Sequence, residues 1–407
     1  QRAHFMVCAV FVVCGNLGLG MVTPMSVPSL LQNRRANELS RGSAMQKARK
    51  LFFLLFAATA AVTGLAAEHR GAAFLAWTAF DCWHWSESDT ERVCESPVID
   101  CPFAWRELVM SWNASAPSGT GFKFEVRAYF GDRPTRYYVM GFWTETPGDF
   151  PRKSVNGQQD ADGEVRTDTL AVREACRRVQ LRVTFFRSAG VDWPRLRFLG
   201  ISLSDPSVRL PPLRPNAAAW GRTLDVPCRS QVDYPEGVSA WCSPTSVSMV
   251  MAYWARAIRK PELDKDVPTV ARGVHDPSWE GTGNWSFNTA YAGQFDKLRA
   301  YVTRLSDVTE IEAWIVRGAP VVASVCYDLL RGQPRTRNSG HLIVCVGFTE
   351  KGDVVVNDPG TRKEMRRSFP REDFMKAWDY SNRTVYLIYP ANFRPPADRF
   401  GHWTGKH

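Results

Sequence analysis

The sequence predicts a multi-domain protein in which an all-β sandwich of jelly-roll type is followed by an α+β domain. Three observations support this. From about residue 74 to residue 203, apolar and polar residues alternate, which is typical of half-buried strands. Residues 206–222, rich in proline and alanine, then interrupt the pattern. From residue 223 onward, helical periods and apolar runs are mixed, as in α+β proteins. At 407 residues the chain is long enough for two cores.

The strands of the first region are clearest where every second residue is apolar, at residues 121–130 and 179–185. Residues 137–143 and 195–203 are also predicted strands, and clusters of Gly, Pro, Asn and Asp separate the four segments. Long helical periods are absent from this part of the sequence. We therefore assign residues 72–205 to the β-sandwich.

The first region is also rich in aromatic residues. Exposed aromatic rings stack on sugars, which would make a glycan a partner of this domain. Filling the core of the sandwich is the favoured interpretation. The residues in question are Trp83, Trp85, Trp105, Trp112, Phe142 and Trp143.

In the second region a helix is predicted after Cys242, because apolar residues recur at helical spacing as far as Ile258. Pro244 lies in its first turn, where proline is tolerated. A further helix is expected after Asp307, which with Glu310 resembles a capping pair.

Apolar runs in the same region predict strands at residues 320–326, 341–348, 353–357 and 384–389. A helix followed by an antiparallel sheet is an α+β layout. We assign residues 223–392 to this second domain, residues 206–222 to a linker and residues 393–407 to a polar tail.

The positive charge of the chain is concentrated near its N-terminus. Residues 1–67 contain seven Lys or Arg and one Asp or Glu, so the remainder carries a net charge of only +4. A weakly basic body without a Lys/Arg stripe argues against a nucleic-acid partner.

Residues 45–67 have the order of a secretory signal peptide: a basic segment, an apolar run over residues 51–65, and small residues before Glu68. A membrane-anchoring helix is the alternative, but the apolar run is short for a span. Residues 1–44 are interpreted as upstream or leader sequence, with a second hydrophobic anchor as the rival interpretation. We expect a secreted protein whose contact with a membrane is limited to the signal segment.

Beyond the signal segment there are eight cysteines: Cys82, Cys94, Cys101, Cys176, Cys228, Cys242, Cys326 and Cys345. Export would permit disulfides, and Cys94 and Cys101 are close enough in sequence to pair around a turn. Cys326 and Cys345 lie in apolar strand patterns and are expected to be buried free thiols. Because no Cys or His spacing resembles a zinc site, neither a metal nor an organic cofactor is expected.

Three residues suggest a nucleophilic cysteine site. Cys242 opens a helix, where unpaired N–H groups and the helix dipole favour a thiolate. His341 opens a strand and would take the proton of the thiol. Asp358 ends the next strand and would orient the imidazole. A core cysteine, a strand-capping histidine and an Asp-Pro-Gly turn are the structural alternatives.

Two further residues compete for these roles, and one adds to them. His275 is the fallback base, and Asn357 is the adjacent rival of Asp358 as orienter. Gln231 precedes the cysteine by eleven positions and would donate its amide to the developing oxyanion.

The segments around Gln231, Trp241–Ser246, Gly340–Phe348 and Gly352–Pro359 resemble family thirty-nine of the cysteine peptidases, particularly its stand-alone secreted bacterial members. The resemblance covers about residues 226–390 and includes the segment 275–290. It implies a papain-like fold with Cys242 as nucleophile, His341 as base, Asp358 as orienter and Gln231 in the oxyanion hole. The β-rich front half resembles the jelly-roll domain that such proteins often carry. Ser243 stands where many relatives have glycine.

The expected function is therefore that of a secreted cysteine peptidase, which hydrolyses peptide bonds through a thioester acyl-enzyme. Its partners would be peptide or protein substrates, cell-wall peptides among them, and the basic loop 331–337 hints at acidic or polar ligands. The alternatives are an acyl or amide transferase with the same triad, and a glycan- or protein-binding protein with a vestigial triad.

Overall fold

The computed structural model describes residues 68–336 and 339–405, all within one compact unit that spans residues 61–407. The leader and signal segments expected at residues 1–44 and 45–67 lie outside the described residues. No helix in the described part of the chain is long and apolar enough to cross a membrane.

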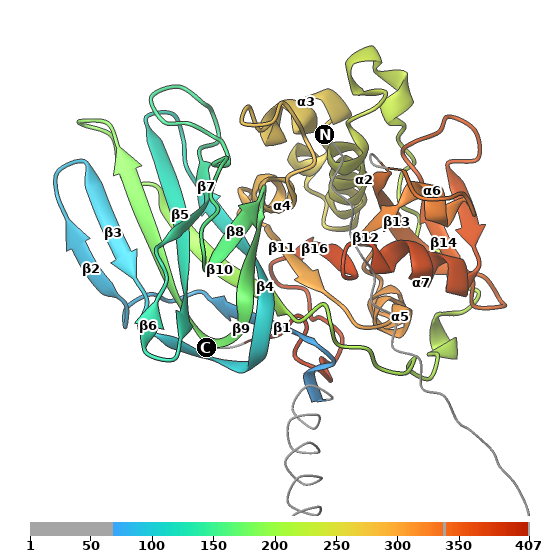
Figure 1. The fold of residues 1–407 in the computed structure, drawn as a ribbon. Helices are drawn as coiled ribbons and strands as arrows, with labels where there is room; N and C mark the ends of the chain where they lie inside the picture. The colour runs from blue at the N-terminus through green and yellow to red at the C-terminus, as the bar shows by residue number, and fades with distance from the viewer. Residues whose placement is uncertain (1–67, 337–338, 406–407) are drawn as a thin grey trace, which may run out of the picture. The chain divides into compact units, whose positions relative to one another are not determined.

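In the described part of the first region, ten antiparallel strands form one large sheet, drawn from blue to green in Figure 1. Its main path runs in the order β1-β10-β4-β9-β3-β2. The four strands expected from alternation are confirmed within β5, β7, β9 and β10. The strands are β1 (Ala72–Trp77), β2 (His84–Glu87), β3 (Glu91–Glu95), β4 (Ile99–Ser115), β5 (Thr120–Phe130), β6 (Arg133–Pro134), β7 (Tyr138–Trp143), β8 (Gly163–Arg166), β9 (Thr169–Arg187) and β10 (Arg195–Ser204).

The long strand β9 organises this sheet. One edge of β9 pairs with β4 and then with β3, and the other edge pairs with β8 and then with β5. Cys94 therefore lies opposite Val183, whereas Asp100, next to Cys101, lies opposite Arg178.

These two places on β9 are about 17 Å apart, but the Cα atoms of a disulfide lie within about 7 Å. Cys94 and Cys101 are therefore too far apart to pair, although their closeness in sequence would have allowed it. All the cysteines in the described part of the chain are free, and Cys326 and Cys345 are buried as expected.

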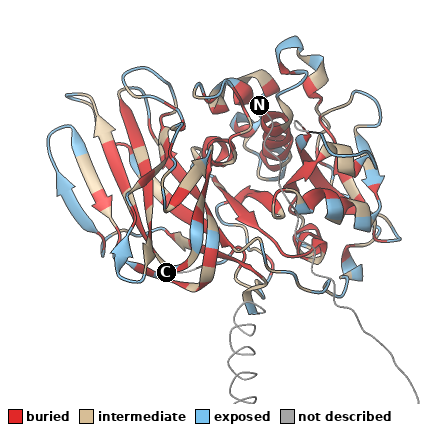
Figure 2. Ribbon diagram, in the orientation of Figure 1, coloured by how far each residue is buried: buried red, intermediate tan, exposed pale blue. Residues whose placement is uncertain are grey.

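Most of the aromatic residues of the first region fill its core. Trp105, Trp112 and Trp143 are fully buried and Trp83 is nearly so, whereas Trp85 is exposed. Trp112 stacks on Phe124, with ring centroids 4.1 Å apart. The red strands of Figure 2 show this buried interior, and the core interpretation holds for these four tryptophans.

The second region contains an antiparallel sheet of six strands in the order β11-β16-β12-β13-β14-β15, with helices packed against it (Figure 1). The expected helices and strands are confirmed. The strands are β11 (Leu298–Arg304), β12 (Val321–Cys326), β13 (Gly340–Phe348), β14 (Val354–Asn357), β15 (Arg366–Phe369) and β16 (Thr384–Pro390). The helices are α2 (Cys242–Ala257), α3 (Val267–Val274), α4 (Trp285–Gly293), α5 (Val308–Val316), α6 (Tyr327–Leu330) and α7 (Arg371–Asp379), with short 3-10 turns η1 (Ala217–Ala219), η2 (Gln231–Asp233), η3 (Pro235–Gly237) and η4 (Pro261–Leu263).

The two regions are joined where β4 lies against β11, the edge strand of the second sheet. The Asn113 side chain donates to the carbonyl oxygen of Ala300 (2.6 Å) and accepts from its N–H (3.1 Å), and Ser111 Oγ accepts from the N–H of Val302 (2.9 Å). A side chain at Gly293 would collide with Asn113, so α4 can approach β4 only with glycine there. The buried apolar residues of both regions consequently form one connected cluster.

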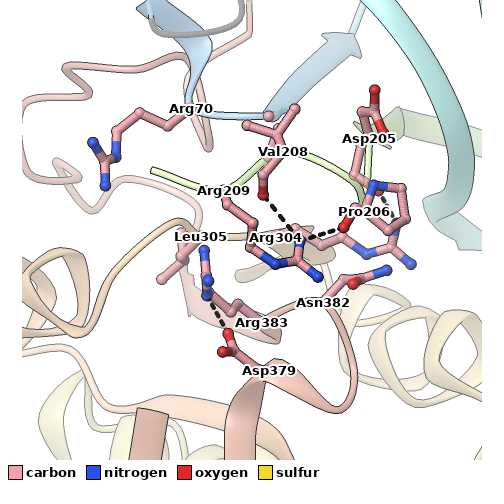
Figure 3. A pocket seen from close by; sticks show the side chains of 13 residues that line it. Arg70, Asp205, Pro206, Val208, Arg209, Arg304, Leu305, Asp379, Asn382 and Arg383 are labelled. Carbon is pink, nitrogen blue, oxygen red and sulfur yellow. Dashed lines mark hydrogen bonds and ion pairs between the residues drawn. The ribbon is translucent and has the colours of Figure 1, made fainter. Parts of the chain in front are cut away.

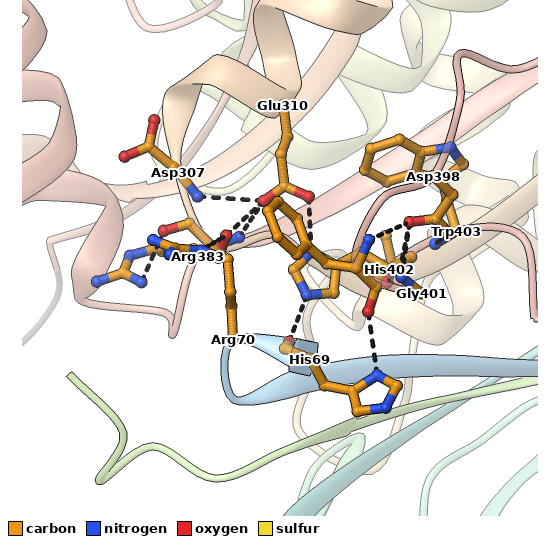
Figure 4. Close-up of polar contacts among 12 residues, drawn as sticks. His69, Arg70, Asp307, Glu310, Arg383, Asp398, Gly401, His402 and Trp403 are labelled. Atoms are coloured by element: carbon orange, nitrogen blue, oxygen red, sulfur yellow. Dashed lines mark hydrogen bonds and ion pairs between the residues drawn. The ribbon is translucent and has the colours of Figure 1, made fainter. Parts of the chain in front are cut away.

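The segment expected to be a polar tail contributes buried side chains to this joint. His402 is fully buried, with Nδ1 2.6 Å from a Glu310 oxygen and Nε2 2.7 Å from the carbonyl oxygen of His69 (Figure 4). Trp403 is buried against Trp314. Asp398 holds the segment in place because its carboxylate accepts from successive backbone N–H groups, including those of His402 and Trp403.

A small cavity of about 50 Å³ lies where the chain leaves the first region, and arginines surround it (Figure 3). Arg70 donates to Ser306 Oγ, and Arg304 pairs with Glu107. Arg209 donates to backbone carbonyls and Arg383 pairs with Asp379. Because these guanidinium groups are committed to the protein, the cavity acts as a structural joint.

Candidate active site

Helix α2 positions the candidate nucleophile. Cys242 is its first residue and is partly exposed, while Trp241 is the N-cap. Burial alone would raise the pKa of the Cys242 thiol. The hydrogen bond and charge of His341, and the backbone N–H groups of Leu342 and Ser243, outweigh burial and lower this pKa below its ordinary value. The site therefore favours a thiolate.

The candidate base lies at the start of β13. His341 is buried, and its Nε2 is 2.8 Å from Asp358 Oδ1, which leaves Nδ1 for Cys242. The ring of Tyr327 packs on the imidazole, with centroids 4.2 Å apart. Burial lowers the pKa of His341, but the bond to Asp358 and the interaction with Cys242 raise it overall to about 9. These interactions therefore favour the imidazolium form of His341.

Asp358 is fully buried and has four hydrogen-bonding partners. Its Oδ1 also accepts from the N–H of Gly360 (2.8 Å), and its Oδ2 accepts from Tyr327 Oη (2.9 Å) and from Arg367. Burial raises the pKa of this carboxyl, but the bonds and charges of these partners hold it well below its usual range.

Tyr327 and Arg367 were not recognised in the sequence. They come from α6 and β15 and carry no local motif. The basic pair at residues 366–367, shortly after the Asp-Pro-Gly turn, was the one available signal.

The two rival residues are placed elsewhere. The Asn357 side chain donates to the carbonyl oxygen of Val226 (3.0 Å) and accepts from Arg366. His275 ends α3, is substantially exposed and lies 3.4 Å from Glu280. The structure thus brings Cys242, His341 and Asp358 together without either rival.

Gln231 lies in η2 and is hydrogen-bonded both to the residue after Asp358 and to the loop before Cys242. Its backbone N–H donates to the carbonyl oxygen of Pro359 (2.9 Å), directly after Asp358. Its side-chain Nε2 donates to the carbonyl oxygen of Val238 (2.9 Å) in the loop that leads to Cys242. The amide is therefore fixed to the loop that precedes Cys242, and the Nε2 group retains a second N–H.

The segment 275–290 supports the same loop. Thr282 Oγ1 donates to the carbonyl oxygen of Ala240 (2.7 Å), two residues before the cysteine. Asn284 caps α4, and its side chain also donates to Asp276 (3.0 Å). From the first region, Asp168 accepts the backbone N–H of Trp285 (2.6 Å), so the turn between β8 and β9 is attached to the start of α4.

The described residues contain no group of three His, Cys, Asp or Glu side chains placed to hold a metal ion. A thiol, an imidazole and a carboxylate in this order are suited to nucleophilic chemistry.

Comparison with known families agrees with a site of this class. Residues 57–204 match the model of the peptidase C39 N-terminal domain, and residues 223–386 match that of the peptidase C39-like family. Both matches are to domains of C39 peptidases, which makes cysteine peptidases the class of protein to which the chain is related.

No curated protein matches the chain. Among solved structures, a candidate C39-like peptidase from Bacillus anthracis is similar at 15% identity, with a TM-score of 0.32. The match covers 41% of this chain and 96% of that one.

Proposed function

We propose that the protein is a secreted cysteine peptidase in which Cys242, His341 and Asp358 form a papain-like triad. The observation that carries the proposal is the position of His341, which interacts with Cys242 and hydrogen-bonds to Asp358 at 2.8 Å. A buried imidazole between a thiol and a carboxylate is suited to moving a proton between nucleophile and leaving group.

In the proposed reaction the Cys242 thiolate attacks the carbonyl carbon of a peptide bond. The amide of Gln231 and backbone N–H groups stabilise the resulting oxyanion. The C–N bond breaks as His341 protonates the leaving amine, which leaves a thioester on Cys242. His341 then takes a proton from water, and the hydroxide releases the acid and restores the thiolate.

Export is part of this proposal and rests on the order of charges, apolar residues and small residues at positions 45–67. A substrate outside the cytoplasm, such as a cell-wall peptide or another protein, follows from it. Sequencing the N-terminus of the protein recovered from culture medium tests export. A protein retained in cells with residues 45–67 intact would contradict it.

The experiment that tests the enzymatic proposal is alkylation of the folded protein with iodoacetamide across a range of pH, read by mass spectrometry at Cys242. We expect fast labelling at about pH 6, well below the range of an ordinary thiol. His341→Ala removes the positive charge beside the sulfur, so labelling should then require alkaline pH. Cys345, buried with its pKa raised by burial, serves as the internal control and should stay unlabelled.

Slow labelling of wild-type Cys242 at every pH would contradict the proposal. With a reactive thiol established, hydrolysis of peptides with and without an added amine identifies the acceptor. Release of free acid alone supports a peptidase, whereas capture of the acyl group by the amine would overturn hydrolysis in favour of transfer.

A further inference from the structure

A cavity of about 510 Å³ is lined by both regions of the chain. The first region contributes the turn between β8 and β9, residues 166–169, and the second contributes Trp279, Trp285, Arg335 and Tyr380. The attachment of Asp168 to the N–H of Trp285 fixes this turn in the wall. The cavity is therefore complete only when the first region is present.

The cavity borders segments that adjoin Cys242 and His341 in the chain or through hydrogen bonds. On one side, Tyr380 Oη is 3.5 Å from the position of a Cβ on Gly340, the residue before His341. On the other, Gly283 follows Thr282, which holds the loop before Cys242. These two contacts are the reason to ask whether a side chain of a peptide bound at Cys242 enters this space.

The acidic and basic side chains that line the cavity differ in whether they can bind a ligand. The acidic groups are occupied: Asp168 accepts from Trp285 and Thr169, while Glu107 accepts from Arg304 (2.9 Å) and Asn382 (2.8 Å).

The basic groups at the rim are exposed to solvent. The Arg166 guanidinium group donates through Nε and Nη2 to the partly exposed carboxylate of Glu164, which leaves Nη1 without a hydrogen-bond partner among the described residues. Arg335, from the basic loop, stacks on Tyr380 at 4.6 Å, and no carboxylate of the described residues lies within ion-pair distance of it. A carboxylate entering the cavity would therefore meet guanidinium groups with free donors.

We propose that this cavity is a specificity subsite which binds an acidic side chain of the peptide substrate, with the β8–β9 turn of the first region as one wall. The inference rests on the proposed peptidase function and adds a substrate class to it. Arg166 and Arg335 recognise the carboxylate, and the rings of Trp279 and Tyr380 pack against its aliphatic part.

Cleavage of a positional library of quenched fluorogenic peptides tests this subsite. We expect wild type to prefer Asp or Glu at one position next to the scissile bond. The double variant Arg166→Gln/Arg335→Gln should lose about tenfold in kcat/KM for such peptides relative to their Gln counterparts. Arg133→Gln removes an exposed arginine of the same region away from the cavity and should keep the preference. Absence of an acidic preference in wild type, or its persistence in the double variant, would overturn the inference.

Thr167, at the tip of the turn, tests the contribution of the first region. Its φ of 58° makes the same backbone demand on any replacement side chain, so Thr167→Lys and Thr167→Glu differ only in charge. Thr167→Lys should raise kcat/KM for the acidic peptides and Thr167→Glu should lower it. Equal values for the two variants would exclude the turn from the subsite.

Binding without catalysis separates this inference from the proposed function. Calorimetric titration of Cys242→Ala protein with blocked tri-glutamate should show saturable binding that weakens about tenfold in the double arginine variant, with blocked tri-lysine as the control. Binding of tri-glutamate together with an unreactive Cys242 would support the subsite and overturn the peptidase. A reactive Cys242 without this binding would do the reverse.

Discussion

At the scale of single residues, the hydrogen-bonding partners of Asp358 explain why a carboxylate, and not an amide, is bonded to His341. Arg367 and Tyr327 both donate to Oδ2, and a neutral amide could not accept from both and from His341 as strongly. The negative charge in turn stabilises the imidazolium, which raises the pKa of His341 to about 9. In the proposed triad, the charge on Asp358 therefore extends the pH range over which the thiolate–imidazolium pair exists.

Replacing Asp358 by Asn should narrow the pH range in which Cys242 is a thiolate and His341 an imidazolium, at both its acid and its alkaline limit. With a weaker imidazolium, the pKa of His341 falls from about 9 and the pKa of Cys242 rises. We expect kcat to fall by about 10²–10⁴-fold, and the acid limb of the alkylation profile to move to higher pH. Asp353→Asn, which changes a partly exposed carboxylate in the same hairpin, is the control and should leave the profile in place. An unshifted profile in Asp358→Asn would remove Asp358 from the proposed role.

The reacting residues could be proposed from sequence because each lies in a short segment with its own signal: a helix start, a strand start and an Asp-Pro-Gly turn. Tyr327 and Arg367 could not, because their role depends on the tertiary approach of α6 and β15 to Asp358. The choice between Asp358 and Asn357 likewise needed the pairing of β14 with β13, which directs the Asn357 amide towards Val226.

At the scale of elements, the capping box of α5 both caps this helix and binds the C-terminal segment of the chain. Asp307 Oδ1 accepts the N–H of Thr309 (2.8 Å), and Glu310 Oε2 accepts the N–H of Asp307 (3.2 Å), so the expected capping box is present. Glu310 also pairs with His402 through its other oxygen. Glu310, the second residue of the capping box, thus also holds the C-terminal segment.

Asp307→Ala removes the side-chain cap of α5 and should lower the free energy of unfolding by about 1–2 kcal/mol. Asp307→Asn can still accept the N–H of Thr309 and should lose less. Urea unfolding followed by circular dichroism measures both. An equal loss in the two variants would assign the effect to the neighbouring Arg371 charge instead of the cap.

The strand β4 could not be predicted from alternation of apolar and polar residues. Its residues from Leu108 to Ala114 are all buried, because the core of the first region lies on one side and α4 with β11 on the other. A strand covered on both faces loses the alternation by which β5 and residues 179–185 of β9 could be predicted. The burial of His402 was equally hidden, because its partners Glu310 and His69 are 92 and 333 positions away in the chain.

The pairing of His402 with Glu310 predicts a pH-dependent stability. Burial lowers the pKa of His402, but Glu310 and the carbonyl oxygen of His69 raise it overall. A raised pKa in the folded state gives a contribution that is complete below the unfolded pKa of about 6.5 and is lost as pH rises through the folded pKa.

His402→Gln should therefore cost about 3 kcal/mol at about pH 6 and less at about pH 9. Urea unfolding of wild type and variant at both pH values measures the difference. His84→Gln, on the exposed strand β2, is the matched control. A cost that is constant with pH would show that packing, not the ion pair, holds the segment.

At the scale of the whole molecule, the first region covers the edge strand β11 of the second sheet. The outer edge of β11 would expose the backbone groups of Ala300 and Val302, and the side chains of Asn113 and Ser111 take the place of a neighbouring strand. The connected core and the buried C-terminal segment lie along the same joint. We therefore expect both regions to unfold in one transition.

Asn113→Ala tests this coupling. It leaves the N–H and the carbonyl of Ala300 buried without partners, which should lower the free energy of unfolding by about 2–4 kcal/mol. Ser111→Ala removes one hydrogen bond and should cost about half as much. The loss should appear equally in circular dichroism, which follows both sheets, and in the exposure of Cys345 to alkylation, which follows the second sheet alone. If Cys345 keeps wild-type protection while the first region unfolds, the two regions are independent and the joint does not stabilise the site.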